Sequence, residues 1–362
     1  MGANKNILII CTSLNLGGSE RQAVWLANKL TESSYQVFFV SLKDSGILSH
    51  ELDERVIVKN FKIGKARSIF SKIYYVFLGI AKLIKLSNSN NIGITISYLF
   101  HSNLVGKLVK KFSRHNNLHI VTFRSDRLSK RDSKESHIRT FILKNLILDK
   151  KTLVVFNSKT GQRKLNLKGV SQHVIYNSPL NISYKQNKLT NKFVYIGRLD
   201  ELKNVKSLVL AISSLNKEEN IELDIFGKGP ELPELKRIVE HNQLSNAINF
   251  KEIDTSISNR LDEYRALLLV STHEAFPNVI IEAMNLGVVP IATKVGDVEW
   301  LLDEDRGILI EGFDYHSIAN GINTFLALSS NQKLEMQERG KSFVSSELNE
   351  QRIYEQWLKL IN

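Results

Sequence analysis

The segment Ser271-Thr-His-Glu-Ala-Phe-Pro-Asn-Val-Ile-Ile-Glu-Ala-Met-Asn-Leu-Gly287 lies between two short hydrophobic runs, 267–270 and 289–292. Short runs rich in Leu, Val and Ile are typical of strands buried in a parallel sheet. A helix is expected to begin at about Asn278, so this part of the chain predicts a strand, a loop, a helix and a second strand. Folds of this kind bind ligands in the loops that follow the carboxyl ends of their strands. We therefore expect a binding site in the loop 271–277.

Two glutamates flank the expected start of this helix, Glu274 in the loop and Glu282 one turn into the helix. The N-terminus of a helix offers backbone N–H groups and a partial positive charge, which suit a phosphate. Carboxylates instead accept hydrogen bonds from hydroxyls. The combination fits a ligand with a phosphate between two hydroxyl-bearing groups, as in a nucleotide diphosphate sugar. The pair by itself is equally compatible with an ordinary acid near a helix N-terminus and a solvated one.

Two cations are expected at the same edge of the same sheet. Arg198 and Lys203 follow the hydrophobic strand 193–197, and a guanidinium and an ammonium facing a diphosphate would neutralise the charge of a departing nucleotide. A third loop, Gly227-Lys-Gly229-Pro, follows the strand 221–226. Because glycine has no side chain, the backbone of this loop is expected to approach a flat base or a phosphate closely.

Both halves of the chain alternate strands with helices, which predicts two parallel sheets wrapped by helices. The expected N-terminal domain covers residues 1–178, the linker 179–191, and the C-terminal domain 192–348. The helix expected from Asn349 has no further strand to follow. The N-terminal domain is the nearest surface on which residues 349–362 can pack.

Charge is distributed unevenly along the 362 residues. Residues 1–180 carry 29 Lys and Arg against 10 Asp and Glu, whereas residues 181–362 carry 20 against 27. A basic half indicates an anionic partner, such as a phospholipid surface, a nucleic acid or a phosphorylated substrate, or else a lysine-rich solvated face. The single cysteine, Cys11, excludes an intrachain disulfide and favours a reducing compartment. With no apolar run long enough to span a bilayer and no signal-peptide pattern, a cytoplasmic location is expected.

The segment 59–85 contains seven basic residues and no acidic one. On a helix its apolar arc is expected to include Phe77, Ile80 and Ala81, which leaves Leu78 and Leu83 on the cationic outer face. A face that is cationic and partly apolar suits an anionic membrane interface. The alternative is an ordinary packed helix with a fringe of lysines.

Taken together, the motifs resemble the retaining nucleotide-sugar glycosyltransferases of family 4, which have the GT-B fold of two Rossmann-like domains facing a cleft. The resemblance covers nearly the whole chain, and the motifs that carry it are Gly17-Gly18-Ser-Glu20, Gly197-Arg198-Leu with Lys203, Gly227-Lys-Gly229, Glu274-Ala-Phe-Pro-Asn-Val with Glu282, and Gly287-Val-Val-Pro-Ile followed by Gly296 and Glu299. The sequence departs from the family pattern at Ala275, at Asp297 and at Arg265. The first two departures are expected to cost little if those residues have negative φ.

The resemblance implies roles for particular residues. Arg198 and Lys203 would hold the donor diphosphate and Glu282 the ribose, while Gly17 and Gly18 let the first loop close over the diphosphate. The transferred sugar and the phosphates would contact Glu274 and the amides of Phe276, Pro277, Asn278 and Val279, with Gly227 and Gly229 also on the donor side. The C-terminal helix would cross back to the first domain.

In the first domain, the stretch 96–104 is similar to the family's His-Ala-Asn-Leu segment and is expected to end a strand. His101 would then contact the sugar or steer the acceptor hydroxyl, as a catalytic residue beside Glu274, or serve only a structural role. Glu20, Asn103 and Arg124 are placed on the acceptor side.

The resemblance also implies front-face transfer, in which the departing diphosphate accepts the proton of the acceptor hydroxyl. A covalent step on Glu274 is the less favoured variant. Asp303-Glu-Asp305 matches a metal signature of another glycosyltransferase fold but lacks basic or glycine residues nearby, so we expect a solvated turn, no essential metal and no cofactor.

The function expected from these residues is a retaining glycosyltransferase that uses a UDP-sugar in preference to a GDP-sugar. Its expected acceptor is a lipid-linked or cell-surface polysaccharide glycan at the inner membrane face, where the protein would bind peripherally, and nucleic acid is not expected as a partner. The alternatives are a nucleotide-sugar epimerase or phosphorylase of the same fold and a catalytically idle basic membrane- or nucleic-acid-binding protein. A dehydrogenase is disfavoured because the first loop lacks the third glycine of the dinucleotide fingerprint.

Overall fold

A computed structural model of the chain describes residues 6–15, 17–43, 46–61, 69–114, 118–124, 134–179, 192–216, 220–252 and 257–362. The chain forms two compact units, residues 1–178 with 351–362 and residues 179–350. The boundary falls between Ser178 and Pro179, and the rest of the expected linker, 180–191, lies outside the described residues. No helix in the described ranges combines the length and apolar character needed to cross a bilayer.

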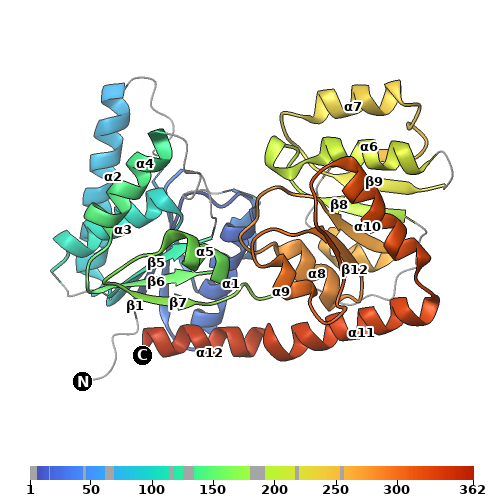
Figure 1. Cartoon of the computed structure of the whole chain (residues 1–362). Helices are drawn as coiled ribbons and strands as arrows, with labels where there is room; N and C mark the ends of the chain where they lie inside the picture. Colours follow the sequence, from blue (N-terminus) through green and yellow to red (C-terminus); the bar gives the residue numbers. More distant parts are fainter. Residues whose placement is uncertain are drawn as a thin grey trace. The chain divides into compact units, whose positions relative to one another are not determined.

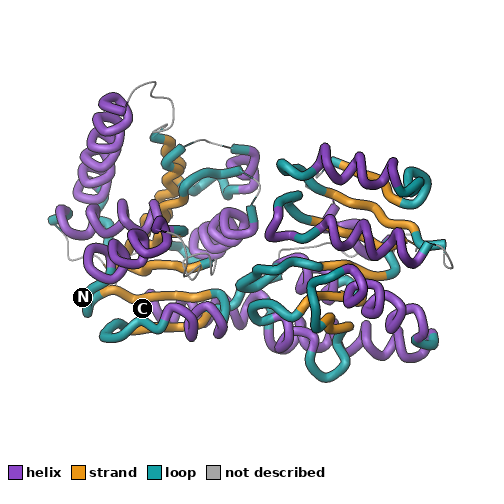
Figure 2. The backbone as a smooth tube through the Cα atoms, turned by 45° about the horizontal axis from the view of Figure 1, so that its top comes forward, coloured by secondary structure: helices purple, strands orange, loops and turns teal. Residues whose placement is uncertain are grey.

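The first unit is built on a parallel sheet of seven strands in the order β3-β2-β1-β4-β5-β6-β7 (Figures 1 and 2). The strands are β1 (Asn6–Cys11), β2 (Gln36–Ser41), β3 (Ile57–Asn60), β4 (Ile94–Tyr98), β5 (Leu118–Phe123), β6 (Thr152–Phe156) and β7 (Ser171–Val174). Its helices are α1 (Gly18–Glu32), α2 (Ile69–Ser89), α3 (Phe100–Phe112), α4 (Lys134–Ile142), α5 (Lys159–Leu165) and α12 (Glu350–Ile361), with short turns η1 (Ile47–Glu51) and η4 (Leu143–Ile147). The strand order reverses between β1 and β4, which is where doubly wound folds bind ligands.

The second unit contains a parallel sheet of six strands in the order β10-β9-β8-β11-β12-β13. The strands are β8 (Lys192–Ile196), β9 (Glu222–Phe226), β10 (Ile248–Lys251), β11 (Ala266–Leu269), β12 (Val289–Thr293) and β13 (Ile308–Ile310). Its helices are α6 (Val205–Leu215), α7 (Leu232–His241), α8 (Asn278–Asn285), α9 (Val298–Leu302), α10 (Tyr315–Ala327) and α11 (Ser330–Glu347), with short turns η5 (Glu201–Lys203) and η6 (Ile257–Glu263). Here the order reverses between β8 and β11, where Ala266 pairs with Phe193.

Buried hydrophobic side chains hold both sheets against their helices. Ile7, Leu8, Ile9 and Ile10 of β1 are fully buried, as expected for a strand covered on both faces. In the second unit, α6, α7 and α10 share one core cluster with the sheet, and α8 and α11 pack near β12. The expected alternation of strands and helices is therefore confirmed. Three short strands, β3, β7 and β10, were not expected, because segments of four residues at or near a sheet edge carry little hydrophobic pattern.

The two C-terminal helices belong to different units. Helix α11 packs against α8 of the second unit, whereas residues 351–362, which include all of α12 except Glu350, belong to the first. Ile353 and Trp357 of α12 are buried, at 0% and 1% exposure. Since these side chains recur every four residues on one helical face, their burial explains how an amphipathic C-terminal helix joins the first unit.

The packed face of α2 differs from the expected one. Leu83 is fully buried against the core of the first unit and Ile80 packs beside it, whereas Phe77 is 68% exposed and Ala81 is also exposed. The assignment of Leu83 to the outer face was wrong. Because apolar side chains surround this helix, periodicity alone did not select the face that meets β2 and α3. Residues 62–68 of the basic segment lie outside the described residues.

Candidate functional site

The two loops that carry the expected donor residues start from neighbouring strands. Strand β8 leads to the loop 197–204 and β11 to the loop 270–277, and the two strands pair in parallel at the reversal of the strand order. Their carboxyl ends therefore lie at one edge of the sheet. This is the position at which open α/β sheets bind ligands.

Lys203 and Glu274 meet at this edge. The ammonium of Lys203 contacts Oε1 of Glu274, and the hydroxyl of Ser271 donates a 2.9 Å hydrogen bond to the same carboxylate oxygen. The side chains of Lys203 and Glu274 are only 17% and 15% exposed. The structure thus pairs two of the expected donor residues, and it adds Ser271, which the sequence analysis had not singled out.

Neighbouring loops hold the Glu274 loop in place on both sides. The N–H of Thr272 donates to the carbonyl of Leu202 at 2.9 Å, and the hydroxyl of Thr293 donates to the carbonyl of Ser271 at 2.6 Å. Gly296 has φ of 58° and its Cα packs against the backbone carbonyls of Glu274 and Ala275, so a side chain there would be strained and would collide with them. The position of Glu274 is therefore set by the backbone.

The two departures from the family pattern cost little backbone strain. Asp297 has φ of −99°, and Ala275 is not among the described non-glycine residues with positive φ. Asp297 also donates its backbone N–H to the carbonyl of Ala275 at 3.2 Å. The expectation of negative φ at both positions is confirmed.

Helix α8 begins at Asn278, where the sequence placed it. Pro277 precedes it without a side-chain capping hydrogen bond, and Phe276 and Pro277 are buried while Asn278 and Val279 are half-buried. Glu282 lies one turn into the helix and is 6% exposed. The start of α8 places backbone N–H groups and a partial positive charge next to the loop of Glu274.

Arg198 lies on the β8 loop but does not share the contacts of Lys203. Its guanidinium pairs with Asp200 at 2.9 Å and the side chain is 58% exposed. The hydroxyl of Tyr195 donates to the carbonyl of Arg198 at 3.0 Å, and burial, with nearby carboxylates of Glu274 and Asp200, raises the pKa of Tyr195 well above its ordinary value. Tyr195 and Asp200 were missed, although each stands within three residues of Arg198 at a strand end.

The structure gives the glycines of the third loop a packing reason in addition to the expected approach of a ligand. A Cβ on Gly229 would collide with the backbone of Leu199, and one on Gly227 would collide with the carbonyl of Gly197. The N–H of Leu199 donates to the carbonyl of Lys228 at 3.0 Å, and the N–H of Glu231 donates to the carbonyl of Leu199 at 3.1 Å. Glycine is required here so that the loop after β9 can pack on the loop that carries Arg198.

In the first unit, Gly17 stands at the start of α1 with Glu20 folded against it. A Cβ on Gly17 would collide with the carboxylate of Glu20, while Gly18 is exposed. Burial raises the pKa of Glu20, partly offset by a hydrogen bond from its own backbone. Gly17 and Glu20 thus share the N-terminus of α1, in the loop that follows β1.

His101 and Asn103 lie in helix α3 and not at the end of a strand. His101 is exposed in the first turn, after Leu99, whose φ of 71° is rare for a residue with a side chain. Asn103 is fully buried, accepts a 2.8 Å hydrogen bond from Ser97 and donates one to the carbonyl of Thr122. The expected acceptor-side place of Asn103 was wrong, because its amide is committed to the core.

Arg124 is also buried, at 9% exposure. Its guanidinium carbon lies 5.2 Å from the ring centroid of Tyr98 and 5.7 Å from that of Trp357, and Nη1 donates to Asn177 at 2.6 Å. Burial lowers the pKa of this guanidinium. Arg124 therefore lies between the sheet and helix α12, and not in the expected acceptor-side position.

The Asp303–Asp305 segment forms a turn, as expected. Oδ1 of Asp303 accepts from the N–H of Glu304, Glu304 pairs with Arg306, and Asp305 pairs with Arg339. Within the described ranges, no group of three or more His, Cys, Asp and Glu side chains is arranged to hold a metal ion.

Comparison with known proteins places these loops in a family. Residues 181–343 match the family model "Glycosyl transferases group 1". A Campylobacter jejuni α-1,4-N-acetyl-D-galactosaminyltransferase that acts on an undecaprenol-linked glycan is 24% identical over 98% of both chains. The poly(ribitol-phosphate) α-N-acetylglucosaminyltransferase of Staphylococcus aureus is 25% identical over 48% of this chain and 36% of its own.

Solved structures show the same fold over the whole chain. Sucrose-phosphate synthase from Thermosynechococcus elongatus superposes with a TM-score of 0.83, at 19% identity, over 98% of both chains. The Anabaena protein HepE in complex with UDP-glucose superposes with a TM-score of 0.82, at 19% identity, over 98% of this chain and 99% of that one. The chain is a glycosyltransferase with the GT-B fold, and its residues 181–343 match the model of glycosyl transferases group 1.

Proposed function

We propose that this glycosyltransferase moves a sugar, with retention, from a UDP-sugar to a lipid-linked or surface-polysaccharide glycan at the cytoplasmic membrane face. The observation that carries the proposal is the pairing of Lys203 with Glu274 beside the start of α8. An ammonium and a helix N-terminus favour a diphosphate, and a carboxylate favours sugar hydroxyls. The three groups together fit an activated sugar.

The transfer step follows from these positions. The bond between the anomeric carbon and the diphosphate breaks with its electron pair on the phosphate oxygen, and Lys203 and the N-terminus of α8 stabilise that charge. The acceptor hydroxyl attacks the anomeric carbon on the same face and gives its proton to the departing phosphate oxygen. Glu274 orients the sugar while Ser271 holds its carboxylate, and Glu282 binds the ribose hydroxyls.

The relatives support the choice of donor and acceptor. The Campylobacter jejuni and Staphylococcus aureus enzymes are both named as α-glycosyltransferases, with an undecaprenol-linked glycan and a poly(ribitol phosphate) as acceptors. An α-linked product from an α-linked nucleotide sugar is transfer with retention. The bound UDP-glucose in the HepE structure supports UDP as the nucleotide of the donor.

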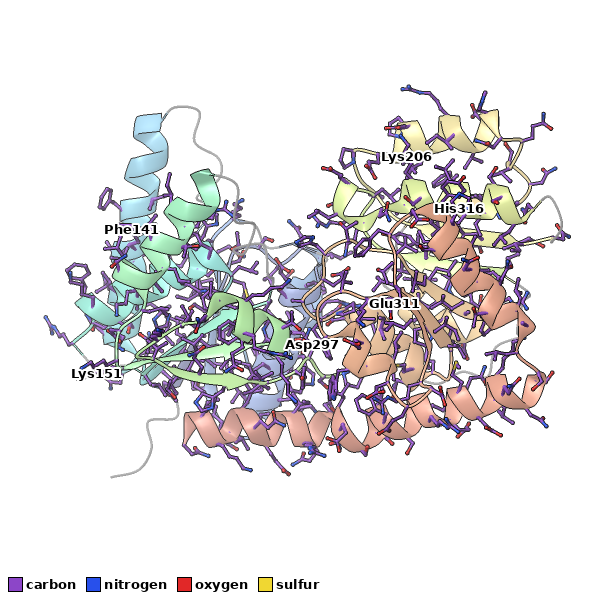
Figure 3. The ribbon with its side chains drawn as sticks, viewed as in Figure 1. Phe141, Lys151, Lys206, Asp297, Glu311 and His316 are labelled. Atoms are coloured by element: carbon purple, nitrogen blue, oxygen red, sulfur yellow. The ribbon has the colours of Figure 1, made fainter. Side chains whose placement is uncertain are left out.

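The surface of the first unit supports a membrane site. Large hydrophobic side chains are exposed on two of its helices, with Phe77 on α2 at 68% and Phe141, labelled in Figure 3, on α4 at 65%. Lys82 and Lys85 are exposed on α2 as well. Apolar side chains enter the interface of a bilayer while lysines bind anionic headgroups, so this combination favours reversible attachment to an anionic leaflet.

Acceptor-dependent release of UDP tests the proposal. With UDP-sugars and an undecaprenyl-diphosphate-linked glycan as acceptor, Lys203→Ala and Glu282→Ala are expected to abolish transfer while the protein stays folded. Lys206→Ala is the matched control, because Lys206 pairs with Glu234 on the surface and is 55% exposed. Full activity in Lys203→Ala and Glu282→Ala would refute the site.

The finer parts of the proposal have separate readouts. Thermal stabilisation by UDP-sugars but not GDP-sugars is expected, because a bound ligand raises the melting temperature by mass action. The anomeric coupling constant of the product, measured by NMR, is expected to match that of the donor. A product of the opposite anomeric configuration contradicts retention, and nucleotide release without acceptor favours an epimerase or hydrolase.

A further inference from the structure

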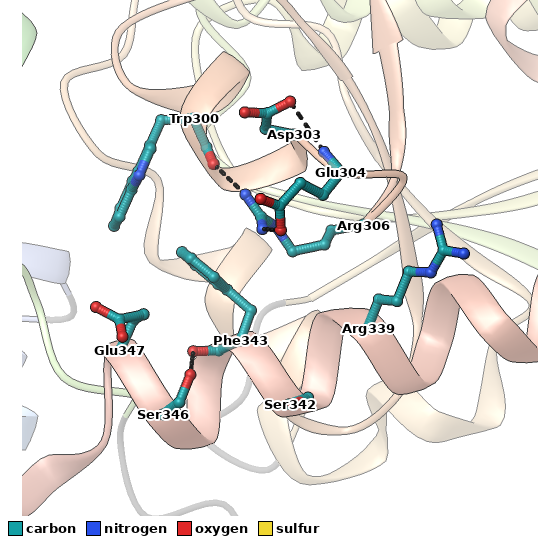
Figure 4. Close-up of a pocket in the computed structure, with 9 residues that line it drawn as sticks. All are labelled: Trp300, Asp303, Glu304, Arg306, Arg339, Ser342, Phe343, Ser346 and Glu347. Atoms are coloured by element: carbon teal, nitrogen blue, oxygen red, sulfur yellow. Dashed lines mark hydrogen bonds and ion pairs between the residues drawn. The ribbon is translucent and has the colours of Figure 1, made fainter.

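A pocket lies in the second unit, and none of the residues that line it belongs to the loops of Lys203 and Glu274. It has a volume of about 650 Å³ and is lined by residues 300–306 and by the C-terminal half of α11 (Figure 4). The segment 303–307 directly precedes β13, so it lies at the amino edge of the sheet, whereas the donor loops follow the carboxyl ends of β8 and β11. This turn therefore lies at the opposite edge of the sheet from the donor loops, and α9, which carries Trp300, connects the two edges.

The pocket has an aromatic wall. The rings of Trp300 and Phe343 meet edge to face, with centroids 5.1 Å apart and planes inclined at 73°. Arg306 fixes both: its guanidinium carbon lies 4.0 Å from the centroid of Phe343, and Nη2 donates to the carbonyl of Trp300 at 2.8 Å. Since the Arg306 side chain is only 7% exposed, it forms a buried support for the rings of Trp300 and Phe343.

Polar groups suited to hydroxyls surround this wall. Glu347 is four residues after Phe343 on α11 and shares its face of the helix, as do Ser342 and Ser346 one turn apart. Asp303 contributes a second carboxylate from the turn after α9. In Figure 4 the rings of Trp300 and Phe343 lie near Glu347, and Arg339 lies at the other end of the pocket.

The charges of the pocket disfavour phosphates and cations. Arg306 already donates to the carbonyl of Leu301, to the carbonyl of Trp300 and to Glu304, and Arg339 pairs with Asp305. Both guanidiniums thus already have carboxylate partners, and Asp303 and Glu347 would repel an anion. A cationic ligand is disfavoured because Arg306 already places its charge against Phe343. Carboxylates beside aromatic rings suit a neutral polyhydroxyl compound, whose hydroxyls can donate to them.

We propose that this pocket binds a neutral glycan segment, with Trp300 against the apolar face of a sugar ring and Phe343 beside its edge, and with Asp303 and Glu347 accepting hydrogen bonds from its hydroxyls. A volume of about 650 Å³ is within the usual range for ligand sites. The choice of a glycan rests on the proposed function, since an enzyme that extends a glycan binds it more tightly when a second site contacts the same glycan. The pocket would thus favour long acceptors over short ones.

Tryptophan provides a direct readout of binding. The sequence contains three tryptophans, of which Trp25 and Trp357 are 7% and 1% exposed, and Trp300 is the one in the pocket. In the full chain labelled with 5-fluorotryptophan, maltotetraose or tetraacetylchitotetraose is expected to shift one ¹⁹F resonance, assigned to Trp300 by its loss in Trp300→Phe. Glu347→Gln and Asp303→Asn keep the shape of the pocket and are each expected to weaken this binding roughly tenfold. Glu338→Gln, on an exposed part of α11, is the control that should bind as the unmodified chain does.

Each other outcome overturns the inference. It fails if neither oligosaccharide shifts the Trp300 resonance, if Glu347→Gln and Asp303→Asn bind as tightly as the unmodified chain, or if tetramethylammonium shifts the resonance instead. Loss of the shift in Lys203→Ala would assign the oligosaccharide to the donor site. Because the readout is binding, it remains valid if transfer is never observed. If transfer is observed, Glu347→Gln is expected to raise KM for a long acceptor while kcat for a short one is unchanged.

Discussion

The ammonium of Lys203 contacts the carboxylate of Glu274, 71 residues later in the chain. This contact joins the loop after β8 to the loop after β11 at the reversal of the strand order. The ammonium of Lys203 is thereby held near the loop that leads into α8, with the carboxylate of Glu274 as its partner. In the proposed function a diphosphate would share Lys203 with Glu274, so we expect the strength of this ion pair to affect donor binding.

The hydroxyl of Ser271 is expected to position Glu274. Ser271→Ala removes one hydrogen bond to a carboxylate, which is worth about 1.5–3 kcal/mol for a charged group, so kcat/KM should fall roughly tenfold or more. The melting temperature should also fall, because the same hydrogen bond is lost from the folded protein. The matched control is Ser213→Ala, which removes a hydroxyl bonded to Asn242 near the C-terminal end of α6, whereas the site loop 197–204 precedes the start of this helix. Equal kinetics in both variants would contradict a role for Ser271.

Gly229 and Gly340 should respond in opposite ways to alanine. Gly229→Ala forces a Cβ against the backbone of Leu199, and overpacking of this kind costs about 1–3 kcal/mol of unfolding free energy. In helix α11 a Cβ on Gly340 meets only ordinary contacts at 3.6 Å, so Gly340→Ala should stabilise by about 0.5–1 kcal/mol. Chemical denaturation measures both. A stable Gly229→Ala protein with normal donor binding would show that the loops after β8 and β9 separate easily.

Arg124 should hold helix α12 on the first unit. Arg124→Leu removes the guanidinium that lies over Tyr98 and Trp357 and bonds Asn177, and we expect faster hydrogen exchange in residues 351–361. Desolvated cation–π contacts contribute about 2 kcal/mol, which corresponds to roughly thirtyfold faster exchange by local opening. Arg163→Leu, at an exposed position on α5, is the control. Unchanged exchange in α12 would assign its attachment to Ile353 and Trp357 alone.

His119 should make stability depend on pH. Its Nε2 is 2.8 Å from Ser97 Oγ in a fully buried site, and burial lowers the pKa of the imidazole from 6.5 to about 3. Between these values the unfolded chain binds the proton and the folded chain does not. Stability is therefore complete above pH 6.5 and falls as the pH decreases from 6.5 towards 3, with a slope of at most about 1.4 kcal/mol per pH unit.

The comparison variant for this effect is His119→Gln. Glutamine keeps an N–H donor for Ser97 but does not titrate, so its melting temperature should fall less than that of the unmodified chain between pH 6.5 and pH 4. Parallel pH profiles in the two proteins would show that other groups cause the acid sensitivity.

Membrane attachment should depend on the exposed aromatic side chains of the first unit. Phe77→Ser and Phe141→Ser are each expected to reduce co-sedimentation with vesicles of phosphatidylglycerol, because burial of an aromatic ring contributes about 2 kcal/mol. Phe313→Ser changes a comparably exposed ring of the second unit, 42% exposed, and should bind as the unmodified chain does. Equal loss in all three variants, or no binding to the vesicles at any salt concentration, contradicts the proposed surface.

Much of the fold was readable from local pattern. The buried runs of β1 and β11 and the start of α8 at Asn278 stand where hydrophobicity and proline placed them. The face of α2 was not readable, because Leu83 and Phe77 are both apolar and only contact with α3 and the sheet decides which is buried. Likewise, Asn103 and Arg124 have side chains of the types found in binding sites, but both are buried. Asn103 bonds Ser97 and Thr122, and Arg124 lies over the ring of Trp357.

The sequence by itself determined the two parallel sheets and the loops in which donor residues stand, since hydrophobic runs and their order along the chain specify strands and connections. Tertiary structure alone decided the partner of each polar side chain. Lys203 pairs with Glu274 and not with a carboxylate nearer to it in the sequence, and Gly229 packs on Leu199. Such contacts join residues far apart in sequence, and their distances depend on strand order and backbone packing, which no local pattern encodes.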